Sequence, residues 1–142
     1  MAAFPVSIVT PEHVLLDQQA EAVVTRTVDG DITFLSGHSP FIGVLEPGLV
    51  RLQSDDGSEQ RAVVRGGFVQ VDAAGVRVLA PVAELTGDID EGEARQQLEA
   101  AEAAVAEVAG TVAGDDPATA RRLAAAEEDR RWAQVKVDAT QS

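Results

Sequence analysis

Cysteine is absent from this 142-residue chain. Without a thiol, the protein forms no disulfide, has no thiolate nucleophile and cannot build a cysteine-based zinc site. Its two histidines, His13 and His38, have no nearby serine in the context of a nucleophile elbow. The sequence therefore contains no visible constellation for acyl transfer, and a structural hydrogen bond is the better interpretation of each histidine.

Aromatic residues make up only 4% of the sequence, although hydrophobic residues make up 45%. A core must therefore be built from valine, leucine, isoleucine and alanine, and pockets with broad aromatic walls are hard to form. No apolar run approaches the roughly 20 residues that span a bilayer. Residues 1–5 lack the basic and apolar regions of a secretion signal. We expect a cytosolic protein whose membrane association comes through a partner.

Basic residues are scarce, with 11 Lys and Arg against 24 Asp and Glu, and the net charge is −13. Such a surface repels phosphate backbones and anionic lipid headgroups. The composition therefore argues against nucleic-acid binding and against direct membrane insertion. It favours a protein partner that carries basic patches.

The composition changes near Gly87, which divides the chain into residues 1–87 and 88–142. The first part is rich in Val, Gly, Thr and Pro, and the second in Ala, Glu and Arg, which is typical of helices. Strands are predicted at residues 4–10, 13–16, 20–27, 32–35, 49–53, 60–65, 68–71 and 76–80. The polar residues 17–19 are expected to separate two of them. Many short strands at this spacing predict a sandwich or a barrel.

Two glycine motifs are interpreted as backbone features. Asp29 and Gly30 lie between apolar runs, where glycine can take the positive φ of a hairpin turn. Gly66 and Gly67 precede a strand, whereas a phosphate-binding glycine loop leads into a helix. A bulge or a tight corner is therefore predicted at the glycine pair.

Two helices are predicted in residues 88–142, because apolar residues recur every three or four positions. The first stripe consists of Ala94, Leu98, Ala101, Val105 and Val108, and the second of Leu123, Ala126, Ala133 and Val137, interrupted by Arg130. Gly110 and Gly114 bracket the break between them. Since alanine buries little apolar area, this two-helix arm should be weakly held and suited to changing position.

Capping residues support both helices. Asp88 or Asp90 can cap the first, and Asp116 followed by Pro117 provides a cap and a favourable first position for the second. The second helix is also basic within an acidic chain, through Arg121, Arg122, Arg130, Arg131 and Lys136. Two interpretations stay open: a solvated face paired with the carboxylates of residues 127–129, or a docking surface for an acidic partner.

An ordered set of motifs resembles the epsilon subunit of bacterial F-type ATP synthases. The motifs are Val9-Thr10-Pro11-Glu12, residues 27–35 followed by Ser36-Gly37-His38-Ser39-Pro40, residues 45–50, residues 64–71 with Gly66-Gly67-Phe68, Val78-Leu79-Ala80 and Ile89-Asp90-Glu91. The match covers most of residues 4–95, and beyond them only the helical pattern agrees. The resemblance implies an α+β protein with an antiparallel sandwich of about ten strands, followed by an antiparallel two-helix hairpin.

The resemblance also implies partners and no catalytic residue or cofactor. The sandwich would rest on the membrane ring of c subunits and pack on the gamma subunit. By position, the residues facing the ring would be Asp29, Asp31, Gly37, His38 and Pro40. The helical arm of this family inhibits ATP hydrolysis when it extends toward the catalytic alpha and beta subunits. Arg121, Arg122, Arg130 and Arg131 would then meet acidic residues there.

Some members of the family bind ATP through an Ile-Asp-x-x-Arg-Ala motif at the start of the arm. Here Ile89 and Asp90 match, but Glu93 stands where the first arginine would be, and Arg95 is displaced by two positions. A carboxylate beside a phosphate is disfavoured by like charge. Weak or absent ATP binding is therefore predicted.

Two alternatives from other classes are a free-standing adaptor that recruits partners through its arm, and a small metal enzyme. The enzyme would use Asp29, Asp31 and His38, but two carboxylates and one histidine lack the further ligands that a closed metal site needs. No metal is expected, and a non-catalytic rotor subunit is the preferred hypothesis.

Overall fold

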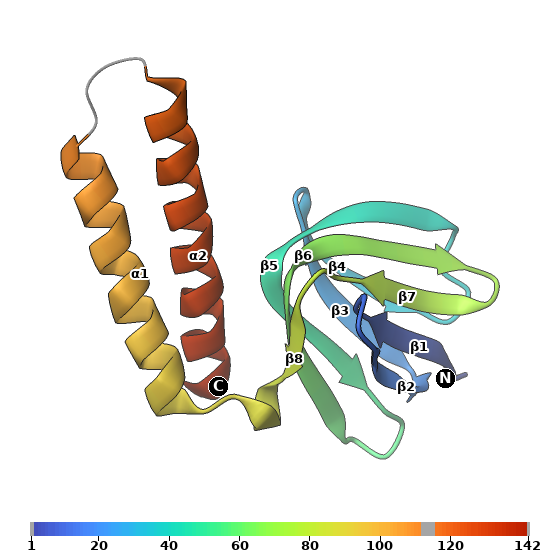
Figure 1. Cartoon of the computed structure of the whole chain (residues 1–142). Helices are drawn as coiled ribbons and strands as arrows, with labels where there is room; N and C mark the ends of the chain where they lie inside the picture. The colour runs from blue at the N-terminus through green and yellow to red at the C-terminus, as the bar shows by residue number, and fades with distance from the viewer. Residues whose placement is uncertain (1, 112–115, 142) are drawn as a thin grey trace. The chain divides into compact units, whose positions relative to one another are not determined.

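The chain forms two compact units, Met1–Asp88 and Ile89–Ser142, in a computed structural model that describes residues 2–111 and 116–141 (Figure 1). The division falls one residue beyond the boundary expected from composition. The first unit consists of strands and a short 3-10 helix. Its elements are β1 (Phe4–Val9), β2 (Val14–Ala20), β3 (Ala22–Thr27), β4 (Gly30–Leu35), β5 (Phe41–Gln53), β6 (Glu59–Asp72), β7 (Gly75–Leu79), β8 (Ala83–Leu85) and η1 (Thr86–Asp88).

All eight strands belong to one continuous sheet in the order β2-β1-β7-β6-β5-β3-β4, with β8 pairing the first half of β6. The sheet folds over itself, so that its two halves enclose a core as the layers of a sandwich (Figure 1). Neighbouring strands are antiparallel except β1 and β7, which run parallel from Val6 opposite Val76 to Val9 opposite Leu79. The predicted sandwich is confirmed. Because β5 and β6 bend from one layer into the other, counting each as two segments accounts for the ten strands expected.

The strand bounds differ from the prediction in several places. Residues 41–48 belong to β5, the strands predicted at 60–65 and 68–71 are both part of β6, and β8 was not predicted. The polar residues 17–19 do not separate two strands but lie within β2 and pair with residues 5–7 of β1. The position of β2 explains this, because it forms an edge of the sheet. Asp17 and Gln19 are exposed there, so their polar side chains remain in water.

The bend lies at an irregularity in the longest strand pair. Leu45 pairs with Gly67 and Pro47 with Arg65, so Glu46 and Gly66 between them have no direct partner in the register. Gly66 and Gly67 have φ values of 80° and 118°. A Cβ atom on Gly67 would overlap the carbonyl oxygen of Leu79 and lie 2.9 Å from the Cα of Ala80. The predicted glycine corner is confirmed.

The core of the sandwich is rich in valine. Its largest fully buried side chains include Phe34, Ile8, Leu52, Val6, Val23, Val50, Val64, Val69 and Val78. This composition agrees with the expectation from the low aromatic content. The β-branched side chains also suit strands, where they pack well on a pleated surface.

The second unit is a helical hairpin of α1 (Glu91–Thr111) and α2 (Pro117–Gln141), which lie side by side (Figure 1). The stripe predicted for α1 is confirmed, since Ala94 and Val108 are buried and the residues between them on this stripe are half-buried. The stripe of α2 is wider than predicted, because Trp132, Lys136 and Ala139 are also buried. The predicted helix break includes Gly114, which lies outside the described residues.

Both predicted caps are present. The Asp90 carboxylate accepts the amide of Glu93 at 2.9 Å. The Asp116 carboxylate accepts the amide of Ala118 at 3.1 Å and the hydroxyl of Thr119 at 2.8 Å. The Thr119 hydroxyl, followed by the Ala118 amide, holds the pKa of Asp116 below its usual range. These bonds satisfy amides that a helix start otherwise leaves unpaired.

A lysine connects the two helices. Lys136 is only 7% exposed, and its ammonium group donates to the amide oxygen of Gln97 on α1 at 2.9 Å. The same nitrogen lies 5.7 Å from the centre of the Trp132 ring. Hydrogen bonding and the ring compensate part of the cost of burying a charge between Ala-rich helices.

We expect Gly67→Ala to destabilise the sandwich more than Gly30→Ala. Both glycines have φ of 118°, but nothing lies within 4 Å of a Cβ on Gly30, whereas one on Gly67 meets the β7 backbone. Backbone strain alone costs about 1–2 kcal/mol. The additional overlap should raise the loss for Gly67→Ala to roughly 3 kcal/mol or more. Both losses in the free energy of unfolding can be measured by urea denaturation, with the NMR signals of β6 as the readout. Equal losses for the two variants would contradict the close approach of β7 to Gly67.

Candidate partner-binding surfaces

The hairpin turn between β3 and β4 is a compact polar tip. The hydroxyl of Thr27 donates to the carbonyl of Gly30 at 2.8 Å and accepts the amide of Asp29 at 3.1 Å. At the start of β4, Asp31 pairs with Arg26 at 3.1 Å, and both side chains are 61% exposed. Such an exposed pair contributes little to stability. The Asp31 carboxylate is accessible to a partner.

The connection from β4 to β5 forms a second, separate tip. The amide of His38 donates to the carbonyl of Leu35 at 3.1 Å, and Gly37 between them has φ of 81°. The Nδ1 of His38 lies within hydrogen-bond distance of the carbonyl oxygen of Ser39, at 2.7 Å. The imidazole meets the buried ring of Phe34 edge-on, with centroids 4.9 Å apart. His38 thus has the structural role that the sequence predicted for it.

The structure does not bring the two predicted ring-facing segments together. Asp29 and Asp31 lie at the beginning of β4, whereas Gly37, His38 and Pro40 follow its end. A six-residue strand separates its ends by roughly 17 Å. A partner that touches both segments must therefore extend along the whole strand.

The same separation bears on the metal hypothesis. His38 cannot share an ion with Asp29 and Asp31 across the length of β4. Within residues 2–111 and 116–141, no group of three or more His, Asp or Glu side chains could hold a metal ion. The structure therefore gives no support to the small metal enzyme.

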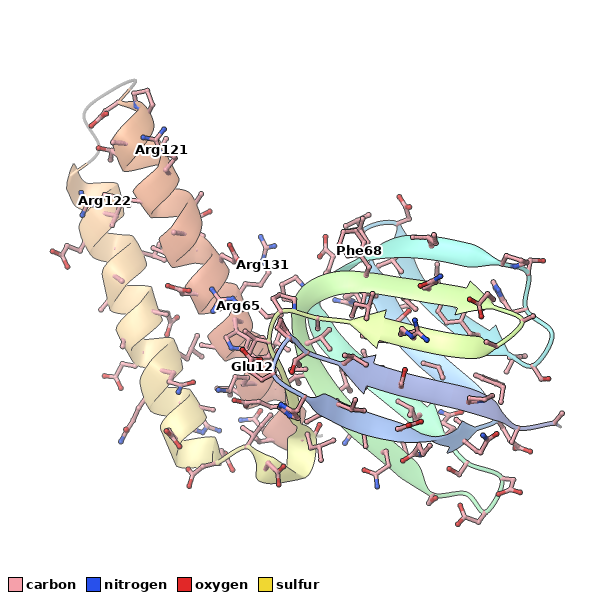
Figure 2. The ribbon with its side chains drawn as sticks, turned by 45° about the vertical axis from the view of Figure 1, so that its right-hand side comes forward. Glu12, Arg65, Phe68, Arg121, Arg122 and Arg131 are labelled. Carbon is pink, nitrogen blue, oxygen red and sulfur yellow. The ribbon has the colours of Figure 1, made fainter. Side chains whose placement is uncertain are left out.

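The outer face of the sheet carries a row of apolar side chains that the sequence analysis missed. We call it the apolar band, and it consists of Val14 on β2, Val9 on β1, Leu79 on β7, Phe68 on β6 and Val44 on β5. Direct register pairs join each residue to the next across five adjacent strands, which Figure 2 shows side by side with Phe68 labelled. Four of the five are 40–57% exposed, and Val9 is half-buried. Ile42, at 74% exposed, lies beside the band on β5.

A signal for the apolar band was present in the sequence. Val76-Arg77-Val78-Leu79 and Phe68-Val69 place apolar residues at consecutive positions, although antiparallel strands with one solvated face alternate. Val69 and Val78 face the core and their neighbours Phe68 and Leu79 face outward. Apolar residues on both faces indicate that something covers the outer face.

The start of the arm has its charged groups engaged. The carboxylate of Asp90 caps α1 through the Glu93 amide, and Arg95 pairs with Glu91 at 3.0 Å. Ile89 is half-buried and Glu93 is exposed. Asp90, which matches the nucleotide motif, therefore caps the helix, and the displaced Arg95 forms an ion pair.

The four arginines of α2 do not share one face. With about 100° per residue, Arg121 and Arg131 lie about 80° apart. Both are well around the helix from Leu123, Ala126, Ala133 and Val137, although Arg121 lies in line with the buried Trp132 and Ala139. Arg122 and Arg130 lie at the helical angles of the stripe itself, where Arg122 is exposed and Arg130 is half-buried. Figure 2 labels Arg121 and Arg122 near the start of α2 and Arg131 further along. Arg121 and Arg131 are exposed and are the pair furthest around the helix from Leu123, Ala126, Ala133 and Val137.

No helix in the described part of the chain is long and apolar enough to cross a membrane. The chain is a small sandwich with a helical hairpin, and the outer face of its sheet exposes a row of apolar side chains. A surface of this kind defines the class of a protein that packs against a partner.

Comparisons with known proteins identify the family. The model of the β-sandwich domain of the ATP synthase delta/epsilon chain matches residues 3–86. The ATP synthase epsilon chain of Desulforudis audaxviator is 47% identical over 97 residues, covering 68% of this chain and 70% of the relative. That of Streptomyces coelicolor is 39% identical over 100 residues, covering 70% and 81%. The chain belongs to the ATP synthase delta/epsilon family, as the motif resemblance predicted.

Solved structures share the fold. A chain in the Euglena gracilis mitochondrial ATP synthase, in a structure of OSCP, F1 and the c-ring, aligns with a TM-score of 0.78 at 22% identity. That alignment covers all of this chain and 83% of the other. A chain from the central stalk and c-ring of the Tetrahymena thermophila mitochondrial ATP synthase aligns with a TM-score of 0.59 at 17% identity, covering 96% of each chain.

Proposed function

We propose that this epsilon-type chain is a non-catalytic part of the central stalk of a proton-translocating F-type ATP synthase. It helps to couple the catalytic head to the c-ring and lies peripherally on the cytoplasmic side of the membrane. Family membership supports this function, and so do the structural relatives described as parts of F1/c-ring and central-stalk assemblies. No cofactor is required for this role.

The observation that carries the proposal is the apolar band. A free monomer seldom exposes a contiguous apolar row of this kind, and larger patches mark interaction sites. The gamma subunit covers the apolar band in the assembled stalk. This arrangement also distinguishes a stalk subunit from a free-standing adaptor, because the adaptor would recruit partners through its arm and leave the band in water.

The c-ring is the partner of the β3–β4 tip. Val28 in this turn is 55% exposed. Asp31 pairs with Arg26, Glu46 lines the same surface hollow, and Asp29 precedes Gly30 in the turn. The tip is therefore acidic and fits a basic or polar loop. A ring surface that extends along β4 also contacts Gly37, His38 and Pro40.

We expect Phe68→Asp to weaken binding to gamma by at least about tenfold. Burial of one large apolar side chain contributes about 1.5–3 kcal/mol, and a carboxylate in its place would also be desolvated without a partner. The dissociation constant of the purified chain for gamma, determined by calorimetry, measures the effect. Since Phe68 is 53% exposed, the free variant should melt at nearly the same temperature.

The matched control is Leu35→Asp. Leu35 is 44% exposed on β4, away from the apolar band, so its replacement should leave the affinity for gamma unchanged. Equal weakening by both variants, or no weakening by Phe68→Asp, would contradict gamma as the partner of the apolar band.

The helical hairpin is the regulatory arm in this proposal. When it extends toward the alpha and beta subunits, it inhibits ATP hydrolysis through cations of α2. Arg121 and Arg131 carry most of this contact, because both are exposed and lie furthest around α2 from Leu123, Ala126, Ala133 and Val137. Arg122 and Arg130, which lie at the helical angles of the stripe, contribute less.

Removal of residues 89–142 should increase the hydrolysis rate of the assembled enzyme, because the extended arm can no longer form. Arg121→Glu with Arg131→Glu should produce a large part of the same increase by replacing attraction with like-charge repulsion. Steady-state ATP hydrolysis of the complex measures both. Glu99→Gln with Glu102→Gln, exposed on α1, is the control and should leave the rate unchanged. An unchanged rate after the deletion excludes inhibition by the arm.

Regulation of the arm does not depend on ATP in this chain. The Asp90 and Arg95 side chains are engaged within α1, and Glu93 would lie beside the bound phosphates. Calorimetry with Mg-ATP and the full chain should detect no binding at micromolar concentrations. Glu93→Gln should not create a site, because the cap and the ion pair persist; a micromolar affinity of the native chain would reverse this conclusion.

A further inference from the structure

The apolar band runs across the strands rather than along one of them. Each of its five residues comes from a different strand, and register pairs connect them in sequence from Val14 to Val44. Adjacent strands lie about 4.8 Å apart, so the apolar band is roughly 19 Å long. It is only one residue wide over most of this length, with Ile42 beside it at the β5 end. The partner surface should therefore be long, narrow and perpendicular to the strands.

An α-helix matches this shape. Its apolar stripe advances about 5.4 Å per turn, close to the spacing of the strands, so each turn can place one side chain beside one residue of the apolar band. A length of 19 Å corresponds to about 13 residues. An extended segment would place same-side residues about 6.8 Å apart, which is out of step with the strands.

The polar row next to the apolar band adds a charge pattern. Asp17, Ser7, Arg77 and Gln70 are opposite one another on β2, β1, β7 and β6, along one side of the band. Asp17 and Arg77 are exposed and two strand spacings apart, about 10 Å. Along a helix this distance corresponds to about seven residues, or two turns, which keeps both partner side chains on one face.

We infer that a single amphipathic α-helix of about 13 residues docks across the five strands on the apolar band. Its apolar stripe faces Val14, Leu79, Phe68 and Val44. On one flank it carries a basic residue opposite Asp17 and, about seven positions away, an acidic residue opposite Arg77. The inference rests on the proposed function in one respect, since it assigns this helix to gamma.

Photochemical crosslinking from single cysteines tests the inference. Because the native chain has no cysteine, each introduced thiol can be labelled uniquely with a short apolar diazirine reagent. Leu79→Cys, Phe68→Cys and Val44→Cys occupy three neighbouring strands. After assembly with gamma and irradiation, mass spectrometry identifies the crosslinked residues. Leu35→Cys, away from the apolar band, is the control that should not label gamma.

A docked helix predicts that the three positions label one gamma segment at sites three or four residues apart, in the order of the strands. Labels two residues apart, or scattered over unconnected segments of gamma, would exclude the helix while retaining gamma as the partner. Labelling of another subunit, or of none, from all three positions would instead reject gamma as the occupant.

The charge pattern predicts that Arg77→Glu weakens the complex by about tenfold, and that reversal of one acidic residue on the labelled helix restores it. If no charge reversal on the labelled helix restores binding, the pairing of Arg77 with an acidic residue of that helix is rejected.

Discussion

The arrangement of the sandwich depends on one backbone constraint, the close approach of β7 to the corner of β6. Before Gly66 and Gly67, β6 pairs with β8, and after them it pairs with β7. The change of partner is possible because Gly67 has no Cβ to collide with the carbonyl of Leu79. The same corner turns β5 and β6 from one layer into the other. Both the enclosed core and the outer face are consequences of it.

The corner also explains why binding surface and core are made of the same residue types. Beyond Gly67, consecutive residues of β6 point alternately inward and outward, so Val69 enters the core and Phe68 enters the apolar band. Leu79 is brought beside Phe68 by the register of β7. The proposed partner of the outer face and the core of the inner face rest on the same physical effect, which is removal of apolar surface from water.

The helices of the arm depend on more local interactions than the strands of the sandwich. Its helices begin at local caps, Asp90 and Asp116, and each can be explained within a few residues of sequence. Their contact is Ala-rich, with Lys136 and Gln97 providing a hydrogen bond between them. A hairpin encoded in this local way agrees with the proposed regulatory arm, because its caps do not depend on the valine-rich core of the sandwich.

The sequence by itself determined the features that depend on neighbouring residues: the helix caps, the stripe of α1, the glycine corner and the family motifs. Only the tertiary structure decided which distant residues meet. It placed Asp31 and His38 at opposite ends of β4, and it joined five strands into the apolar band. It also showed that residues 17–19 continue an edge strand. Sequence spacing does not reveal strand order or register, because both are chosen by burial over the whole sheet.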